Sequence, residues 1–134
     1  MEMFRKLFRQ DREKGQALTE FALVLPVLAL LLFAILQLGV VFHQYVNITD
    51  AARAGARQGA VSRHLGTDAA TAVEDRVRES AGDLDQSKLG VTVSSTWQQG
   101  EDVTVTTTYP YDIDVLGVVV KSGNLTSTTT ERVE

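Results

Sequence analysis

The 134-residue sequence contains no cysteine and only two histidines. Without cysteine the chain can form neither a disulfide framework nor a thiolate metal site. This absence is compatible with a location outside the cytoplasm, where disulfides are permitted but not required. His43 and His64 fall on one predicted helix about 31 Å apart, so they cannot bind the same metal ion. We therefore predict no metal site and no cofactor.

The sequence also lacks the patterns that support catalysis. Catalysis needs an activated nucleophile or an acid–base pair in a cleft, and no such arrangement stands out. There is no Gly-rich phosphate loop. Asp112 and Asp114 are two carboxylates that could touch Ca²⁺, but a calcium loop needs more oxygen ligands than these, so we interpret them as loop residues. The sequence predicts a protein that is not an enzyme.

Positive charge is scarce outside the N-terminus. Residues 16–134 carry eight basic and fourteen acidic side chains, a net charge of −6, which gives no electrostatic case for binding nucleic acid. Residues 1–15 carry five basic and three acidic side chains. A basic flank before an apolar segment is retained in the cytoplasm while the far side is exported. We therefore predict a cytoplasmic leader over residues 1–15 and an extracytoplasmic head over residues 64–134.

One long apolar run follows the leader. Residues 21–42 form a stretch of 22 residues without charge, in which Gln37 is the one strongly polar side chain. As a helix it would span about 33 Å, close to the roughly 30 Å hydrocarbon core of a bilayer. A chain of this size cannot bury such a helix on all sides. We predict a transmembrane segment at residues 21–42, within one long helix over residues 16–63 that tolerates Pro26.

The junction between leader and apolar run carries a short motif. Gly15 and Gln16 are followed by Glu20 at the fifth position after the glycine, and Phe21 opens the apolar run. This junction resembles a class III signal peptide, the prepilin cleavage region, in which the cut would fall between Gly15 and Gln16.

Three further stretches extend this resemblance to residues 14–61. They read ALVLP at 22–26, FHQY at 42–45 and DAARAGAR at 50–57. Together with the junction they resemble TadE-like proteins of tight-adherence (Flp-type) pilus systems. The resemblance implies a type IV pilin-like structural subunit, minor or major, that a prepilin peptidase processes. It implies as partners other pilin-like subunits and a pilus assembly platform. It implies a single pass of the inner (cytoplasmic) membrane, or a place in an extracellular adhesion pilus (fimbrium).

Glu20 is the residue whose chemistry most needs an explanation. A carboxylate costs about 2.5–3.5 kcal/mol at the centre of a membrane helix and less near its end. The resemblance implies that Glu20 pairs with the new α-amine of Gln16 in a neighbouring subunit, which makes Glu20 and Phe21 assembly residues. Alternatively, the carboxylate of Glu20 reaches the cytoplasmic interface or interacts with the positive end of the helix dipole.

Small residues repeat every four positions beyond the apolar run. Such rows let another backbone approach the helix closely. The partner could be the head of the same chain or another subunit. The two rows are Ala51, Gly55, Gly59 and Ala52, Ala56, Ala60.

The C-terminal half changes from a helical period to a period of two. A second helix is expected over residues 68–81, followed by a polar linker. Alternating apolar and Thr or Ser residues then predict three antiparallel strands. These are residues 91–97, residues 103–109 closed by Pro110, and residues 125–133 after a turn at 122–124. The predicted fold class is α+β, with a long N-terminal transmembrane helix, a short second helix and a small three-stranded antiparallel sheet.

Two other functions remain open at this stage. One is an unprocessed, membrane-anchored pilus assembly factor. The other is a signal-anchored extracytoplasmic binding module, in which the apolar patch at residues 115–120 and the Thr-rich sheet would bind a ligand or a surface. The pairing of Gly15 with Glu20 favours the pilin-like subunit, because a simple anchor does not need it.

Overall fold

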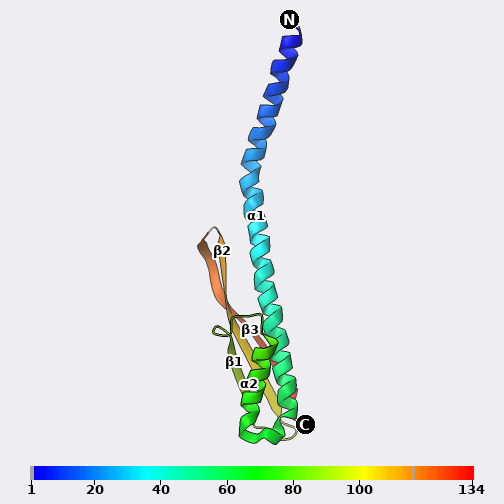
Figure 1. Ribbon diagram of the computed structural model, residues 1–134, viewed down its shortest axis with the longest axis vertical. Coiled ribbons are helices and arrows are strands. Elements are labelled where there is room, and N and C mark those ends of the chain that lie inside the picture. Colours follow the sequence, from blue (N-terminus) through cyan, green and yellow to red (C-terminus); the bar gives the residue numbers. More distant parts are fainter. Residues whose placement is uncertain (1, 116) are drawn as a thin grey trace. The chain divides into compact units, whose positions relative to one another are not determined.

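The computed structural model describes the backbone of residues 2–115 and 117–134, and the side chains of residues 15–115 and 117–134. It confirms an α+β fold with a long N-terminal apolar helix, a short second helix and a three-stranded antiparallel sheet (Figure 1). The basic side chains of the predicted leader lie outside the described residues. The elements are α1 (Glu2–Val61), the 3₁₀ helix η1 (Arg63–Asp68), α2 (Ala69–Ser80), β1 (Gly90–Ser95), β2 (Asp102–Val115) and β3 (Val118–Arg132).

Helix α1 is longer at its start than the sequence predicts. It begins at Glu2 instead of Gln16 and continues through Gly15 and Pro26 to Val61. The residues before Gly15 are mostly Arg, Lys, Glu, Leu and Met, which have high helix propensity, and this extends the helix. The chain divides into two compact units, residues up to Gln37 and Leu38–Glu134. From here on 'head' means this second unit, which includes the C-terminal part of α1 as well as residues 64–134.

The sheet has the strand order β1-β2-β3 with antiparallel neighbours. The hairpin between β2 and β3 closes where Val115 pairs with Val118, and Gly117 adopts a positive φ of 84° there. The turn predicted at 122–124 is therefore wrong. Gly123 lies inside β3 opposite Tyr111, whose ring covers the space that a side chain would occupy. A Ser-Gly-Asn sequence is typical of turns, but here the glycine accommodates an aromatic ring.

Pro110 does not end its strand either. It lies within β2, which continues to Val115 and pairs with β3 throughout. Strand β1 pairs with β2 only as far as Thr108. Beyond that residue no described strand pairs with β2 on the β1 side, and a residue without an N–H can be accommodated there. The far part of the β2–β3 hairpin is consequently a two-stranded ribbon.

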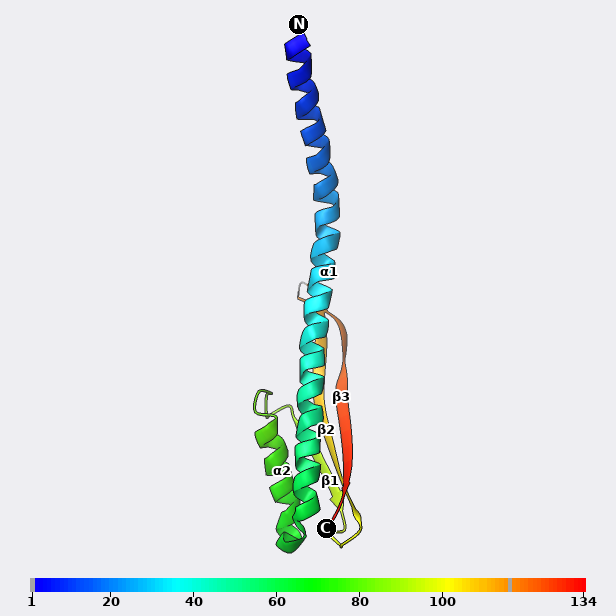
Figure 2. The same cartoon turned by 90° about the vertical axis from the view of Figure 1, so that its right-hand side faces the viewer.

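The core of the head lies between the C-terminal part of α1, helix α2 and the sheet (Figure 2). Leu84 and Leu89, which the sequence places in a polar linker, are both buried in this core. The linker therefore closes one end of the core. The other core residues are Ile48, Ala51, Ala56, Val73, Val77, Ala81, Val103, Val105, Tyr109 and Val133.

A buried hydroxyl joins β2 to α1. Thr107 is fully buried, and its Oγ1 donates a hydrogen bond to the carbonyl oxygen of Ile48 over 2.9 Å. The same hydroxyl lies 3.4 Å from the carbonyl oxygen of Ser127 in β3. The alternating pattern puts Thr107 on the apolar face of β2, where its hydroxyl needs a polar partner. Its hydrogen bond to Ile48 therefore fixes the position of β2 along the axis of α1.

We expect Thr107→Val to lower the free energy of unfolding by about 1 kcal/mol, because the shape is kept and one buried hydrogen bond is lost. Urea unfolding in detergent micelles can be followed by the fluorescence of Trp97, which packs against the core. Thr106→Val is the matched control, since Thr106 bonds only to Thr128 on the solvent side of the sheet. Equal losses in the two variants would contradict a special role for Thr107.

The C-terminal residues are tied to the end of α1. The N–H of Val133 donates to the carbonyl oxygen of Glu101 over 2.8 Å, and the N–H of Glu134 donates to the carbonyl oxygen of Ala60 over 2.9 Å. Val133 is buried in the core. These contacts bring the last strand, the β1–β2 loop and the last turn of α1 together.

Candidate functional site

The predicted processing and assembly residues lie on consecutive turns of α1. Gln16 and Glu20 are both exposed, and the Gln16 side-chain amide donates to the Glu20 carboxylate over 3.0 Å. Thr19 Oγ1 donates to the carbonyl oxygen of Gly15 over 2.9 Å. A Cβ added at Gly15 would meet no described atom within 4 Å. Among the side chains that the structure describes, the partner of Glu20 is thus a neutral amide.

Most of the apolar run that follows is exposed. The helix is long and apolar enough to cross a membrane, and its most apolar window buries none of its residues in the protein. Phe21, at the start of the run, is exposed, and the large side chains through Phe42 are also mostly exposed. Exposed apolar surface of this extent marks a membrane or protein interaction surface.

Both rows of small residues are buried within the head. A side chain at Gly55 would overlap Val77 of α2, and one at Gly59 would come within 2.7 Å of Val103 in β2. Ala51 and Ala56 belong to the same core as these valines. The structure therefore gives these rows a partner in the same chain, which was one of the two alternatives. The alanines, each at most 9% exposed, are Ala51, Ala52, Ala56 and Ala60.

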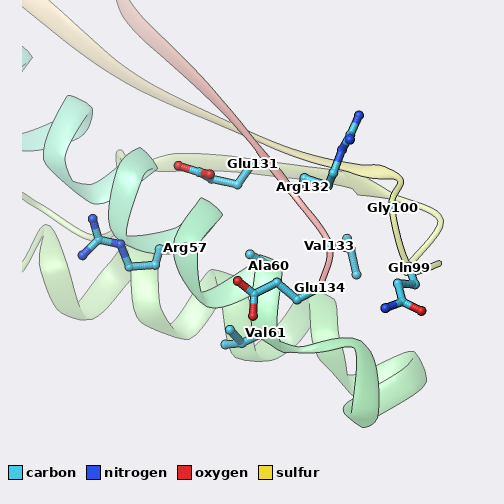
Figure 3. Close-up of a pocket in the computed structure, with 9 residues that line it drawn as sticks. All are labelled: Arg57, Ala60, Val61, Gln99, Gly100, Glu131, Arg132, Val133 and Glu134. Carbon is cyan, nitrogen blue, oxygen red and sulfur yellow. The ribbon is translucent and has the colours of Figure 1, made fainter.

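A polar hollow of about 580 Å³ lies beside the last turn of α1 (Figure 3). Two arginines and two glutamates line it, but Arg132 extends away from Arg57 in Figure 3, so the two positive charges do not converge on one point. The mixed charges do not form a nucleophile–base arrangement of the kind that covalent catalysis needs. Its lining is Arg57, Ala60, Val61, Gln99, Gly100, Glu131, Arg132, Val133 and Glu134.

The other polar candidates from the sequence stay apart. The His43 ring bonds to the Asn47 amide at 3.1 Å, and the His64 ring lies 3.1 Å from the carbonyl oxygen of Val61. Asp112 and Asp114 lie on β2 instead of a loop. Among the residues that the structure describes, no group of three or more His, Asp or Glu side chains could hold a metal ion.

One carboxyl group has a shifted pKa. Hydrogen bonds from the hydroxyl and N–H of Ser87 lower the pKa of Asp85, and the charge of Lys88 acts in the same direction. A lowered pKa in the folded state stabilises the fold above the ordinary value of 3.8, and this contribution is lost as the pH falls below it. Asp85 is exposed in the loop after α2, so the shift reports a local turn and no catalytic site.

The tip of the β2–β3 hairpin is an exposed apolar patch. Val118, Val119 and Val120 are 66%, 59% and 67% exposed. The signal in the sequence is a break in the alternation, because consecutive valines place apolar side chains on both faces of β3. Leu116, which belongs to the predicted patch at residues 115–120, lies outside the described residues.

These features define a class of protein, namely a small α+β head on a long helix that can anchor it in a membrane. The family model described as TadE-like protein matches residues 15–57, which confirms the predicted resemblance to that family. No curated protein and no solved structure gives a significant match. The matched segment begins at Gly15 and contains the apolar run and most of the small-residue rows.

Proposed function

We propose that this chain is a pilin-like structural subunit, minor or major, of a tight-adherence pilus. The match to the TadE-like family suggests involvement with such a pilus. We further propose that the protein is inserted in the inner membrane by residues 21–42 with the head outside, and that it is assembled through the N-terminal part of α1. Its role is structural and not catalytic. Its partners would be a prepilin peptidase, other pilin-like subunits and the assembly platform.

The observation that carries this proposal is where the family match lies. It begins at the glycine of the predicted cleavage junction and covers the helix, while leaving α2 and the sheet outside. The matched segment is thus the one that would be processed, inserted and assembled. The exposed apolar run supports insertion, because burying that surface in lipid is strongly favourable.

The two parts of α1 have different surroundings. The small-residue rows in its C-terminal part pack within the head, since α2 and β2 cover them. The N-terminal part offers Glu20 and an apolar surface that is mostly exposed. Subunit contacts in a filament would therefore involve the apolar run, and the head would be displayed on the outside.

We expect Gly15→Leu to abolish removal of the leader. A peptidase that cuts after Gly15 must approach the backbone closely, and a leucine side chain would block it. The helix itself should tolerate the change, since the site has open space. The intact mass of the membrane-extracted protein gives the result, with Gly39→Leu as a control because Gly39 also has open space around it. Full-length wild-type protein in surface-assembled material would contradict cleavage.

A second candidate function is an unprocessed membrane-anchored assembly factor. The observation that favours it is the continuity of α1, which runs through Gly15 without a break. The same mass measurement separates the two functions. Wild-type protein that retains its leader and stays in the membrane fraction would support the assembly factor.

A further inference from the structure

We infer that the tip of the β2–β3 hairpin makes a second contact with the lipid bilayer, at the outer face of the membrane that α1 crosses. This inference rests on the membrane insertion in the proposed function. The three exposed valines at residues 118–120 are the contacting residues. The occupant of this apolar surface is lipid, because the hairpin points along the head toward the end at which α1 enters its apolar run.

The direction follows from contacts within the head. A side chain at Gly59 would meet Val103, one at Gly55 would meet Val105, and Thr107 bonds to Ile48. As the residue numbers rise along β2, the numbers of the α1 residues beside them therefore fall. The hairpin runs antiparallel to the helix and leads toward the apolar run.

The next contact between the hairpin and α1, beyond the Thr107 hydrogen bond, lies at the end of the apolar run. Tyr109 pairs with Leu125 of β3, and Leu125 lines an apolar groove together with α1 residues from Leu38 to Tyr45. From Tyr109 the hairpin continues in the same direction to Val115, about 20 Å at 3.3 Å per residue. Its tip lies past the level at which the sequence predicts that the helix enters the bilayer. The groove is lined by Leu38, Gly39, Val41, Phe42, Tyr45 and Leu125.

The side chains along the hairpin follow the order found at membrane interfaces. Tyr111 comes first, packed on Gly123, then Lys121 opposite Ile113, and then the valines. Tyr and Lys are favoured at the level of the headgroups, and apolar residues are favoured deeper. Elsewhere β3 alternates, with Thr residues on its outer face. Apolar side chains on both faces suit a strand that is surrounded by lipid.

Two carboxylates limit the depth of this contact. Asp112 pairs with Ser122 and Asp114 pairs with Val119 in the ladder. Asp112 is exposed, and a charged carboxylate is disfavoured inside the hydrocarbon core. The tip therefore enters the boundary between headgroups and acyl chains, as an amphipathic surface element does.

The absence of cysteine allows single labels to test this contact. The full chain carrying Val119→Cys, labelled with the fluorophore NBD, is reconstituted into phosphatidylcholine vesicles. We expect blue-shifted emission and quenching by lipids that carry a quencher on the acyl chain. Thr128→Cys, on the exposed face of β3, is the matched control and should be quenched only by aqueous iodide. Leu31→Cys, in the apolar run, is the positive control for membrane insertion.

Three results would overturn the inference. If the label at residue 119 behaves like the label at 128, the tip lies in water. If it is blue-shifted but shielded from lipid quenchers, and the shift weakens as the protein is diluted in lipid, the tip contacts a second copy of the chain instead. If the label at residue 31 is also not quenched by lipid, the membrane insertion of the proposed function fails together with the inference. Quenching at 31 without quenching at 119 overturns the hairpin contact alone.

Discussion

Replacing Gly55 with leucine should destabilise the head by at least about 3 kcal/mol, a large part of the roughly 5–15 kcal/mol that stabilises a typical domain. A Cβ at this position overlaps Val77 and also comes within 3.4 Å of Val105 and 3.5 Å of Val73. These valines belong to α2 and β2, so a leucine cannot be accommodated by moving a single side chain. The substitution would separate α1 from both of its neighbours.

The unfolding midpoint in urea, followed by Trp97 fluorescence in detergent micelles, measures this effect. Gly39→Leu is the matched control, because it makes the same change in the same helix where no described atom lies within 4 Å of the added Cβ. Both variants gain the same helix propensity from the change of glycine to leucine, so the difference between them isolates the packing. Equal midpoints would show that the small residues are not required for packing.

Replacing Glu20 with glutamine should lower incorporation into filaments about tenfold while leaving insertion and leader removal intact. Hydrogen bonds to charged groups contribute roughly 1.5–3 kcal/mol, and 1.4 kcal/mol corresponds to a factor of ten. Glutamine keeps the carbonyl oxygen that accepts the bond from Gln16, so the contact within the chain is retained and only the charge is lost. Desolvation offsets much of the attraction between buried charges, so the pair would chiefly fix the register between subunits.

The amount of protein in the sheared pilus fraction relative to the membrane fraction measures this effect. Glu20→Asp keeps the charge on a shorter side chain and should retain more incorporation than Glu20→Gln. Normal incorporation of Glu20→Gln would favour a role at the cytoplasmic interface or at the helix dipole. Loss of insertion or of cleavage would show that Glu20 acts before assembly.

The sequence predicts those elements of the fold whose residues follow a regular pattern. The apolar run, the rows of small residues at a spacing of four, and the alternation in β2 each give a periodic signal that local geometry explains. The packing partner of the small residues was not predictable, because a flat helix face is equally suited to its own head and to another subunit. The positions of Val77 beside Gly55 and of Val103 beside Gly59 show that the partner is the head of the same chain.

The errors concern residues whose role depends on distant neighbours. The sequence around Gly123 predicts a turn, because its partner Tyr111 lies twelve residues earlier on another strand. Pro110 predicts a strand end, because the sequence of β2 does not show that β1 is short. The polar neighbours of Leu84 predict a linker, although Leu84 packs in the core. The cleavage residues Gly15 and Gln16 and the assembly residues Glu20 and Phe21 rest on a motif, and their roles stay predictions.

The hydrogen bond from Thr107 to Ile48 has a consequence for biogenesis. It joins residues that are 59 positions apart in the chain, and the partners of the small-residue rows likewise come from α2 and β2. During synthesis α1 is complete, and can already occupy the translocation machinery, before any strand that covers it has been made. Contacts of such large separation form slowly. The rows of small residues on α1 therefore stay uncovered for a time, and, with the topology proposed above, a chaperone outside the cytoplasm would shield them from other nascent copies during that interval.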